Sequence, residues 1–346
     1  MNKIVATVED LSDTDYPMDA SAAEQLSFLL NYAILAPSIY NSQPWQFDLS
    51  ESYVDLYTDK TRPMPVRDPH ARQMIMSCGA ALFYLRIAAR HFGHDVRVEL
   101  FPDQGKTDLL ARLRLLGPKV PTEEEEQLFE AIRTRRTNRN KYEARALPTL
   151  VVEWLGAAAL AEGSLLSVVD GEEVKRNIAA LVAEADHIQW SDKRFRNELA
   201  GWLRSSMGVS YDGVQAEAFG LGDFMPYTVS HVVRRLDLGS DRAAGDAELI
   251  QNSSALAILA TEGDAPLDWL SAGQALARVL LRAAGAGISA SFLNQPIEVD
   301  PLRARLRELC GCAAYPQVAM RVGYAPETPE TPATLRRSSA SVQVQL

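Results

Sequence analysis

The sequence predicts an α+β fold, because segments with helical periodicity alternate with segments of strand periodicity without forming uniform βαβ units. Ser21 begins a capping box that Glu24 completes, and an apolar helical face follows until Pro37 ends the helix. Segment 46–59 then alternates apolar and polar residues with the two-residue period of a half-buried strand or hairpin. With 346 residues, 47% of them hydrophobic, the chain can bury a substantial core.

The later segments continue this mixture. We expect helices over about 70–92, 122–142, from Pro148, and over 172–202, 266–284 and 301–311. We expect strands over 95–101, 111–116, 164–169, 255–261 and 317–324. Segment 206–253 is rich in Gly and Asp and lacks sustained periodicity, so it is predicted to be a long excursion with little regular structure, of the kind that often serves as a lid.

Composition narrows the classes of partner. The formal net charge of −10, from 45 acidic and 35 basic residues, disfavours nucleic acid and anionic membranes, which need an extended positive surface. Three cysteines, Cys78, Cys310 and Cys312, predict neither a disulfide framework nor a structural metal. The start of the chain lacks the apolar stretch of a signal peptide, and no later run approaches membrane-spanning length. We therefore expect a cytoplasmic protein.

The most informative segment is APSIYNSQPWQF, residues 36–47, which packs Pro, Ser, Asn and Gln into a turn between a helix and a strand. The amides of Asn41 and Gln43 can donate and accept along the edge of a planar heteroaromatic ring, while Pro37 and Ser38 offer a compact surface to its face. The same residue types are also common in ordinary turns. The residues alone favour the ordinary turn.

A second motif is basic. In RTRRTNRNKY, residues 133–142, Arg135, Thr137 and Arg139 alternate, which gives guanidinium forks and a hydroxyl suited to one phosphate. A solvated basic face explains the same residues equally well. Near the end of the chain, Arg336 and Arg337 follow a proline-rich stretch and, taken alone, fit a solvated tail.

Together the motifs resemble the nitroreductase superfamily. A-P-S-x-x-N-x-Q-P-W-x-F is similar to the flavin-contacting loop of that family, apart from the bulky Ile39 and Tyr40. R-x-T-x-R at Arg135 is similar to its R-x-S-x-R phosphate-binding signature. In the family a basic residue near the chain end joins the signature on the FMN phosphate, and Arg336 and Arg337 stand in that place.

The same resemblance implies further flavin contacts in GAGISASFLNQP. Ser289 to Gln295 would pass along one face or edge of the isoalloxazine, with Ser291, Phe292 and Leu293 as contact residues. Phe292 and Leu293 depart from the Pro- or Gly-rich turn of ordinary members. A plain strand end and turn is the alternative for this segment.

Each half of the chain lacks what the other half carries. Residues 1–118 have the loop but no arginine signature before it, whereas residues 119–346 have the signature but EGSLLSVV where the loop belongs. In ordinary members the flavin lies between two identical subunits. With MSCGAALFYL at 76–85, this asymmetry resembles the Acg-type branch, whose members look like a nitroreductase dimer fused into one chain. The resemblance implies a pseudo-two-fold internal dimer with one FMN per chain, acting as a monomer or a weak homodimer.

The function implied is FMN-dependent oxidoreduction, from NADH or NADPH to a nitroaromatic, quinone or similar acceptor, with the chemistry on FMN and no catalytic side chain. The alternative is an FMN-sequestering protein whose lid, 206–253, restricts access to the flavin. The histidines show no zinc-ligand pattern, so no metal is predicted. Cys310 and Cys312 fit a buried helix end better than a redox pair. Nucleic-acid binding through 133–141 conflicts with the net charge.

Overall fold

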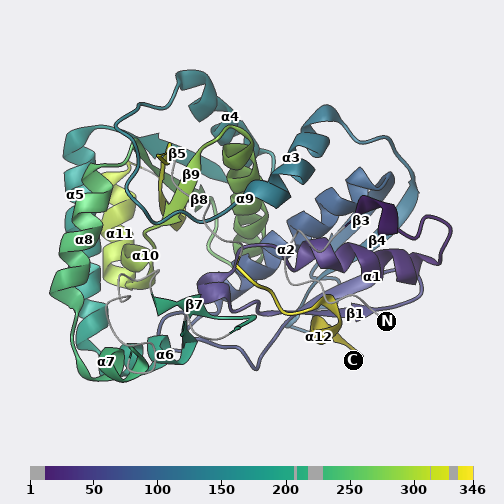
Figure 1. Cartoon of the computed structure of the whole chain (residues 1–346), viewed down its shortest axis with the longest axis horizontal. Coiled ribbons are helices and arrows are strands. Elements are labelled where there is room, and N and C mark those ends of the chain that lie inside the picture. Colours follow the sequence, from purple (N-terminus) through teal and green to yellow (C-terminus); the bar gives the residue numbers. More distant parts are fainter. Residues whose placement is uncertain (1–11, 206–208, 217–228, 312, 327–333, 346) are drawn as a thin grey trace.

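The computed structural model describes residues 12–205, 209–216, 229–311, 313–326 and 334–345, and shows helices packed around separate β-sheets (Figure 1). A five-stranded sheet is built mainly from the first part of the chain, and a four-stranded sheet from the second. The two sheets flank a central pair of long helices, α2 (Arg72–His91) and α9 (Pro266–Gly285). The predicted α+β fold is confirmed.

The first sheet has the strand order β11-β1-β2-β4-β3. Its strands are β1 (Trp45–Leu49), β2 (Val54–Thr58), β3 (His94–Leu100), β4 (Leu109–Pro118) and β11 (Gln343–Val344). β1 and β2 form the predicted hairpin, in which Phe47 lies opposite Leu56. On the other edge of β1, Gln343 of β11 lies opposite Phe47 in a parallel pair. The end of the chain therefore returns to complete the sheet of the first half.

The second sheet has the strand order β5-β8-β10-β9, and all its neighbours are antiparallel. Its strands are β5 (Leu165–Val169), β8 (Ala255–Thr261), β9 (Ser289–Phe292) and β10 (Tyr315–Gly323), and a short parallel ribbon pairs β6 (Leu203–Arg204) with β7 (Val214–Gln215). This order repeats the order β1-β2-β4-β3 of the first sheet. In each sheet a 20-residue helix, α2 or α9, follows the second strand of that order.

The other helices in the described part of the chain pack against the central helices or the sheets, or lie along the lower edge of the molecule in Figure 1. They are α1 (Ala22–Ala33), α3 (Glu123–Thr134), α4 (Thr149–Leu160), α5 (Glu172–Ser191), α6 (Lys193–Trp202), α7 (Val229–Arg235), α8 (Gly239–Gln251), α10 (Gln295–Glu298), α11 (Asp300–Leu309) and α12 (Ser339–Val342), with 3-10 turns at Asp13–Asp15 and Ile39–Asn41. Capping boxes fix two of the starts. Glu24 closes the box on Ser21 before α1, as predicted, and Glu125 closes one on Thr122 before α3.

Two glycines set the distance between the halves. A Cβ atom on Gly79 of α2 would lie 2.2 Å from the carbonyl oxygen of Leu270, and one on Gly273 of α9 would lie 2.0 Å from that of Met76. The two helix backbones therefore touch directly, which only glycine permits. The contact is reciprocal, because each glycine packs against the carbonyl three residues before the glycine of the other helix.

Two of the hydrophobic clusters share this pair of helices. Leu270, Ala277 and Leu281 of α9 pack in the core of the first half, together with α1 and the first sheet. Met76 of α2 packs in the core of the second half, which lies against β8, β9 and β10. Each half completes one of its apolar clusters with a helix of the other, so the two halves form one structural unit.

Two sequence-based expectations are wrong. The helix expected over 122–142 ends at Thr134, and Arg135 already has extended backbone, so the arginine signature lies outside the helix. Segment 206–253 was expected to hold little regular structure, yet α7 and α8 occupy 229–251. Ile250 of α8 packs against α5 in a shared apolar cluster. The apolar face of α8 is narrow, and the Gly and Asp residues around it obscure the helical periodicity in the sequence. Residues 206–208 and 217–228 of that segment, and Cys312, lie outside the described residues.

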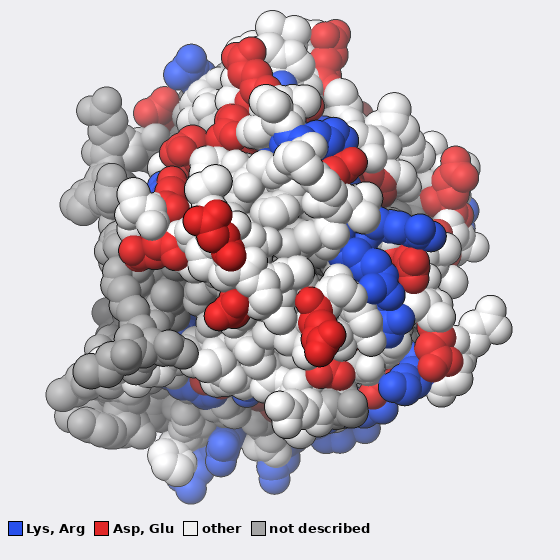
Figure 2. Space-filling view, turned by 90° about the vertical axis from the view of Figure 1, so that its right-hand side faces the viewer, with Lys and Arg blue, Asp and Glu red and all other residues white. Residues whose placement is uncertain are grey.

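The surface carries mixed charge. On the face drawn in Figure 2, acidic and basic side chains are interspersed, and a short basic row borders acidic groups. Among the residues that the structure describes, no helix combines the length and apolar character needed to cross a membrane.

The close contact between the helices predicts that a larger side chain at Gly273 destabilises the fold. Gly273→Ala should lower the free energy of unfolding by about 1–3 kcal/mol, because the added methyl group collides with a main-chain carbonyl that cannot move away. Gly285→Ala is the matched control, since its Cβ would meet no atom within 4 Å. Urea unfolding of both variants measures the difference. Equal midpoints would show that the helices are not held at this distance.

Candidate functional site

A cavity of about 760 Å³ lies between the two halves, a volume in the usual range for small-molecule sites. Residues from both halves and from the C-terminal segment line it. Ten of the residues singled out from the sequence are on its wall, namely Pro37, Ser38, Asn41, Arg135, Thr137, Arg139, Ser291, Phe292, Leu293 and Arg336. Two others, Gln43 and Arg337, are not among the lining residues. The fold thus brings together segments separated by up to three hundred positions in the sequence.

The loop after α1 holds an unusual backbone. Tyr40, Asn41 and Gln43 have φ angles of 48°, 52° and 49°, in the left-handed region that non-glycine residues rarely adopt. Local bonds hold this shape, since the amide of Gln43 donates to Ser38 Oγ at 2.9 Å and the amide of Ile39 donates to Ser77 Oγ of α2 at 3.3 Å. Backbone strain of this kind clusters at ligand sites.

Asn41 lines the cavity, and only one of the two polar atoms of its side-chain amide has a hydrogen-bond partner. Its Nδ2 donates to the carbonyl of Leu335 at 3.1 Å, which ties the loop to the C-terminal segment. Its Oδ1 is buried and has no hydrogen-bond partner among the described residues. An unsatisfied buried acceptor is costly, so a ligand that donates a hydrogen bond would stabilise this atom.

Gln43 is not among the residues that line the cavity. Its side chain is fully buried, and its Nε2 donates to the carbonyl of Tyr211 at 2.7 Å and to that of Asn41 at 3.2 Å. Its Oε1 accepts from the amide of Arg337 at 2.8 Å, while the Arg337 guanidinium lies 3.5 Å from Asp59 Oδ2. Gln43 and Arg337 therefore join the loop to two distant segments, and their side chains are occupied by protein groups.

A group of three arginines forms one basic part of the wall. Arg135 and Arg336 are buried, and Arg136 lies beside them. Arg135 Nη1 and Arg336 Nε are buried without a hydrogen-bond partner, and neither side chain contacts a carboxylate, within the described part of the chain. Burial, together with the positive charges of Arg135 and Arg136, lowers the pKa of Arg336 to about 9. A site with this charge and these free donors favours an anion.

The third position of the signature lies in a different basic group. Arg139 borders the cavity with Arg242 and Arg321, and burial and these two guanidinium groups lower its pKa. The amide of Asn138 donates to the carbonyl of Ala290 at 3.1 Å, so the chain runs along β9 after Arg135. Arg139 therefore has other charged neighbours than Arg135 and Arg336.

Polar residues that were not singled out from the sequence also line the cavity. Arg136 is the third member of the first arginine group, and Asp186 and Asp246 bring carboxyl groups from α5 and α8. Arg136 stands within the signature itself, so the sequence held that signal. No local sequence pattern identifies Asp186 or Asp246 as a site residue. Each is a single acidic residue on an amphipathic helix, and the two helices are far apart in the sequence.

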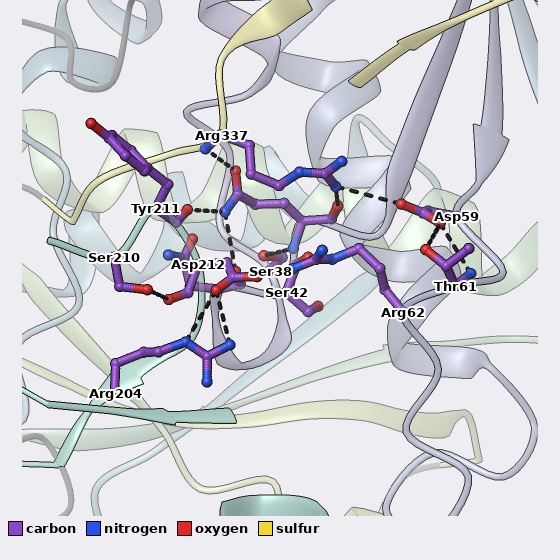
Figure 3. A network of polar contacts seen from close by, with 12 residues as sticks. Ser38, Ser42, Asp59, Thr61, Arg62, Arg204, Ser210, Tyr211, Asp212 and Arg337 are labelled. Carbon is purple, nitrogen blue, oxygen red and sulfur yellow. Dashed lines mark hydrogen bonds and ion pairs between the residues drawn. The ribbon is translucent and has the colours of Figure 1, made fainter. Parts of the chain in front are cut away.

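The segment 209–216 contacts the loop and lines part of the cavity. Asp212 forms ion pairs with Arg62 of the first half and with Arg204, which lies 2.9 Å away (Figure 3). Burial acts to raise the pKa of Asp212, but the hydrogen bonds from both arginines leave it below its usual value. The amide of Gly213 also approaches the carbonyl of Asn41 at 3.4 Å. We call residues 209–216 the latch.

Comparison with known proteins places the chain in a family. It is 31% identical over 325 residues to the Mycobacterium tuberculosis protein named "Putative NAD(P)H nitroreductase Rv3131", covering 92% of this chain and 91% of that protein. The chain belongs to the NAD(P)H nitroreductase family. It is also 29% identical to "Putative NAD(P)H nitroreductase acg" of the same organism, over 88% of this chain and 91% of the relative. The expected Acg-type membership of the nitroreductase superfamily is thereby confirmed.

Other comparisons give lower identities. "Probable NAD(P)H nitroreductase PigM" from a Serratia species is 24% identical over 87% of this chain and 88% of that protein. Among solved structures, a nitroreductase with bound FMN from Bacteroides fragilis has 15% identity and a TM-score of 0.38, covering 59% of this chain and 91% of the other. No protein-family model matches the chain.

Proposed function

We propose that this member of the nitroreductase family binds one FMN in the cavity between its halves, and transfers electrons from NADH or NADPH to a flat acceptor such as a nitroaromatic or a quinone. Family membership supports the reaction class, and the names of the relatives support a nicotinamide reductant. The cofactor assignment rests on one observation: the arginine group has buried donors without a partner, and it lines the same cavity as the 36–47 loop.

The arginine group fits the phosphate of FMN. Arg135 and Arg336 each keep a buried guanidinium nitrogen without a protein partner, and a phosphate offers oxygen acceptors for both. The nearby Thr137 hydroxyl, also on the cavity wall, adds a donor. These groups would hold the phosphate, while Arg139 is left for another part of the ligand or for its reaction partner.

The loop and β9 fit the flavin ring. Pro37 and Ser38 offer a compact surface, and Asn41 Oδ1 is an acceptor that a ring N–H would satisfy. Ser291, Phe292 and Leu293 come from β9 and the turn after it, in the other half. FMN, when bound, supplies the two-electron chemistry, and the residues of the chain bind it, orient it and exclude water.

The arrangement supports a fused pseudo-dimer with one site. The strand order recurs in the two sheets and the glycine contact between α2 and α9 is reciprocal, as expected of two related halves with boundaries near 118. The ring loop comes from the first half and the phosphate signature from the second, and each occurs once. A chain built in this way needs no second copy to complete its flavin site, and acts as a monomer or a weak homodimer in the cytoplasm.

The latch supports a second function, sequestration of FMN. It ties the second half to the loop through the ion pairs of Asp212 and through Gln43, so it closes one route to the cavity. A protein that keeps this closure would hold FMN tightly and react slowly with nicotinamides and acceptors. α8 packs against α5 in a shared apolar cluster, so we assign the closing role to the latch and not to the whole of 206–253.

The purified chain should be yellow and hold close to one FMN per polypeptide, and NADH or NADPH should bleach the flavin in a stopped-flow experiment. Added quinone or nitroaromatic should then restore the colour. Bleaching by neither nicotinamide would reject the oxidoreductase and leave sequestration. An FMN content near two per chain would reject the single site.

Arg135→Ala should weaken FMN binding to the apoprotein by about 1.5–3 kcal/mol, because it removes a charged hydrogen-bond donor from the phosphate. Isothermal titration calorimetry measures the affinity. Arg97→Ala is the control, since its side chain is 66% exposed on β3, away from the cavity. An affinity that stays the same in both variants would mean that the phosphate binds elsewhere.

Asp212→Asn should open the latch, because it removes the charge that holds Arg62 and Arg204. If the latch restricts access, bleaching by NAD(P)H and release of FMN should both accelerate, by about tenfold for a loss of about 1.4 kcal/mol. The exposed Asp170→Asn serves as the control. Identical rates in the two variants would count against any role of the latch in access.

A further inference from the structure

Two carboxyl groups meet at the cavity wall, and one side-chain amide bridges them. Gln295, at the start of α10, donates through Nε2 to Asp246 Oδ2 at 2.7 Å and to Asp186 Oδ1 at 3.4 Å. Asp186 is 2% exposed and Asp246 is 5% exposed, and both line the cavity. Asp186 Oδ2 is buried and has no hydrogen-bond partner among the described residues. This atom is a free acceptor, or a free donor when protonated.

Asp186 and Asp246 have different charged neighbours. Asp246 accepts from Arg242 Nη2 at 3.2 Å, one turn earlier on α8, and it also lies near Arg321 of β10. Asp186 has no ion pair within the described residues, and the positive charges of Arg242 and of Arg67, from the loop before α2, act on it from a distance. Asp246 therefore has an ion-pair partner, whereas Asp186 has none among the described residues.

The direction of titration agrees with this geometry. Burial and the negative charge of Asp246 raise the pKa of Asp186 to about 7, against the smaller opposing effects of Arg242 and the Gln295 hydrogen bond. A carboxylate close by disfavours ionisation of a second carboxyl group for the same electrostatic reason. A buried acid that exchanges its proton near neutral pH is suited to general acid work.

We propose that Asp186, held against Asp246 by Gln295, donates the proton that the reduction of the acceptor consumes. This role rests on the proposed oxidoreductase function. Reduction of a quinone by NAD(P)H follows quinone + NAD(P)H + H⁺ → hydroquinone + NAD(P)⁺, so each turnover takes up one proton beyond the hydrogen that the nicotinamide supplies. The O–H bond of Asp186 breaks as an O–H bond of the hydroquinone forms, and the carboxylate then regains a proton from water.

The protonation state is tested first, on the protein without any reductant. Infrared spectra of the FMN-loaded chain should show a protonated carboxyl C=O band at pH 6 that fades with a midpoint near pH 7 and is missing from Asp186→Asn. In Asp246→Asn, which keeps Asp186 and removes its negative neighbour, the midpoint should move down by about one pH unit or more. A wild-type band that does not respond to Asp186→Asn would overturn the proposal.

Stopped-flow kinetics then tests the role in the reaction. In Asp186→Asn the rate of acceptor reduction by prereduced protein should fall by about 10²-fold and lose its dependence on pH between about 6 and 8. Bleaching of the flavin by NAD(P)H, which requires no proton from the protein, should keep its wild-type rate. Asp170→Asn, exposed before α5, should match the wild type in both steps.

The two proposals fail in different ways. If no variant and no wild-type protein is bleached by NAD(P)H, the oxidoreductase function is wrong, whatever the infrared band shows. If bleaching occurs and Asp186→Asn reduces acceptors at the wild-type rate with the wild-type pH profile, the proton donor is wrong and the oxidoreductase stands. Should Asp186→Asn not fold, Asp246→Asn carries the test, because it should shift the pH profile of acceptor reduction to lower pH.

Discussion

The direct contact between the backbones of α2 and α9 is the constraint on which the rest of the structure depends. Gly79 and Gly273 remove the side chains that would separate the helices, so the two halves approach as closely as their main chains allow. Both walls of the cavity follow from that distance. Ser77 of α2 holds the loop through the amide of Ile39, and Leu276 of α9 lines the cavity from the other half. A rigid crossing gives a ligand site of fixed width without a mobile scaffold.

The cavity wall concentrates polar atoms that the protein leaves unsatisfied. Asn41 Oδ1, Arg135 Nη1, Arg336 Nε and Asp186 Oδ2 are all buried without a partner among the described residues, and all four residues line the same space. Native interiors pair most such atoms, so their accumulation in one place lowers the stability of the empty site. A ligand with an anionic end and a hydrogen-bonding ring would recover that free energy on binding, and tight cofactor retention is the natural result.

The sequence revealed those parts of the site that are encoded locally. The 36–47 loop and the arginine signature are contiguous patterns, and the capping box of α1 and the β1–β2 hairpin follow from short-range periodicity. Long-range packing decided the rest. The side-chain amide of Gln43 bonds to Tyr211 and Arg337. The arginines of the signature lie in two groups. α8 is stabilised because α5 covers its narrow apolar face. The pairing of Asp186 with Asp246 joins two helices and has no local sequence signal.

The C-terminal segment has a consequence for biosynthesis. Asn41 and Gln43, which lie in the first eighth of the chain, receive hydrogen-bond partners from Leu335 and Arg337, near its end. A nascent polypeptide on the ribosome can therefore form its first sheet and the α2 helix long before the loop has its final supports. Only after residues 335–337 have emerged can the loop take up its left-handed backbone with every supporting bond in place. A ligand that needs the supported loop would bind only after residues 335–337 have been made, and chains shortened before them would fold in part yet lack these supports.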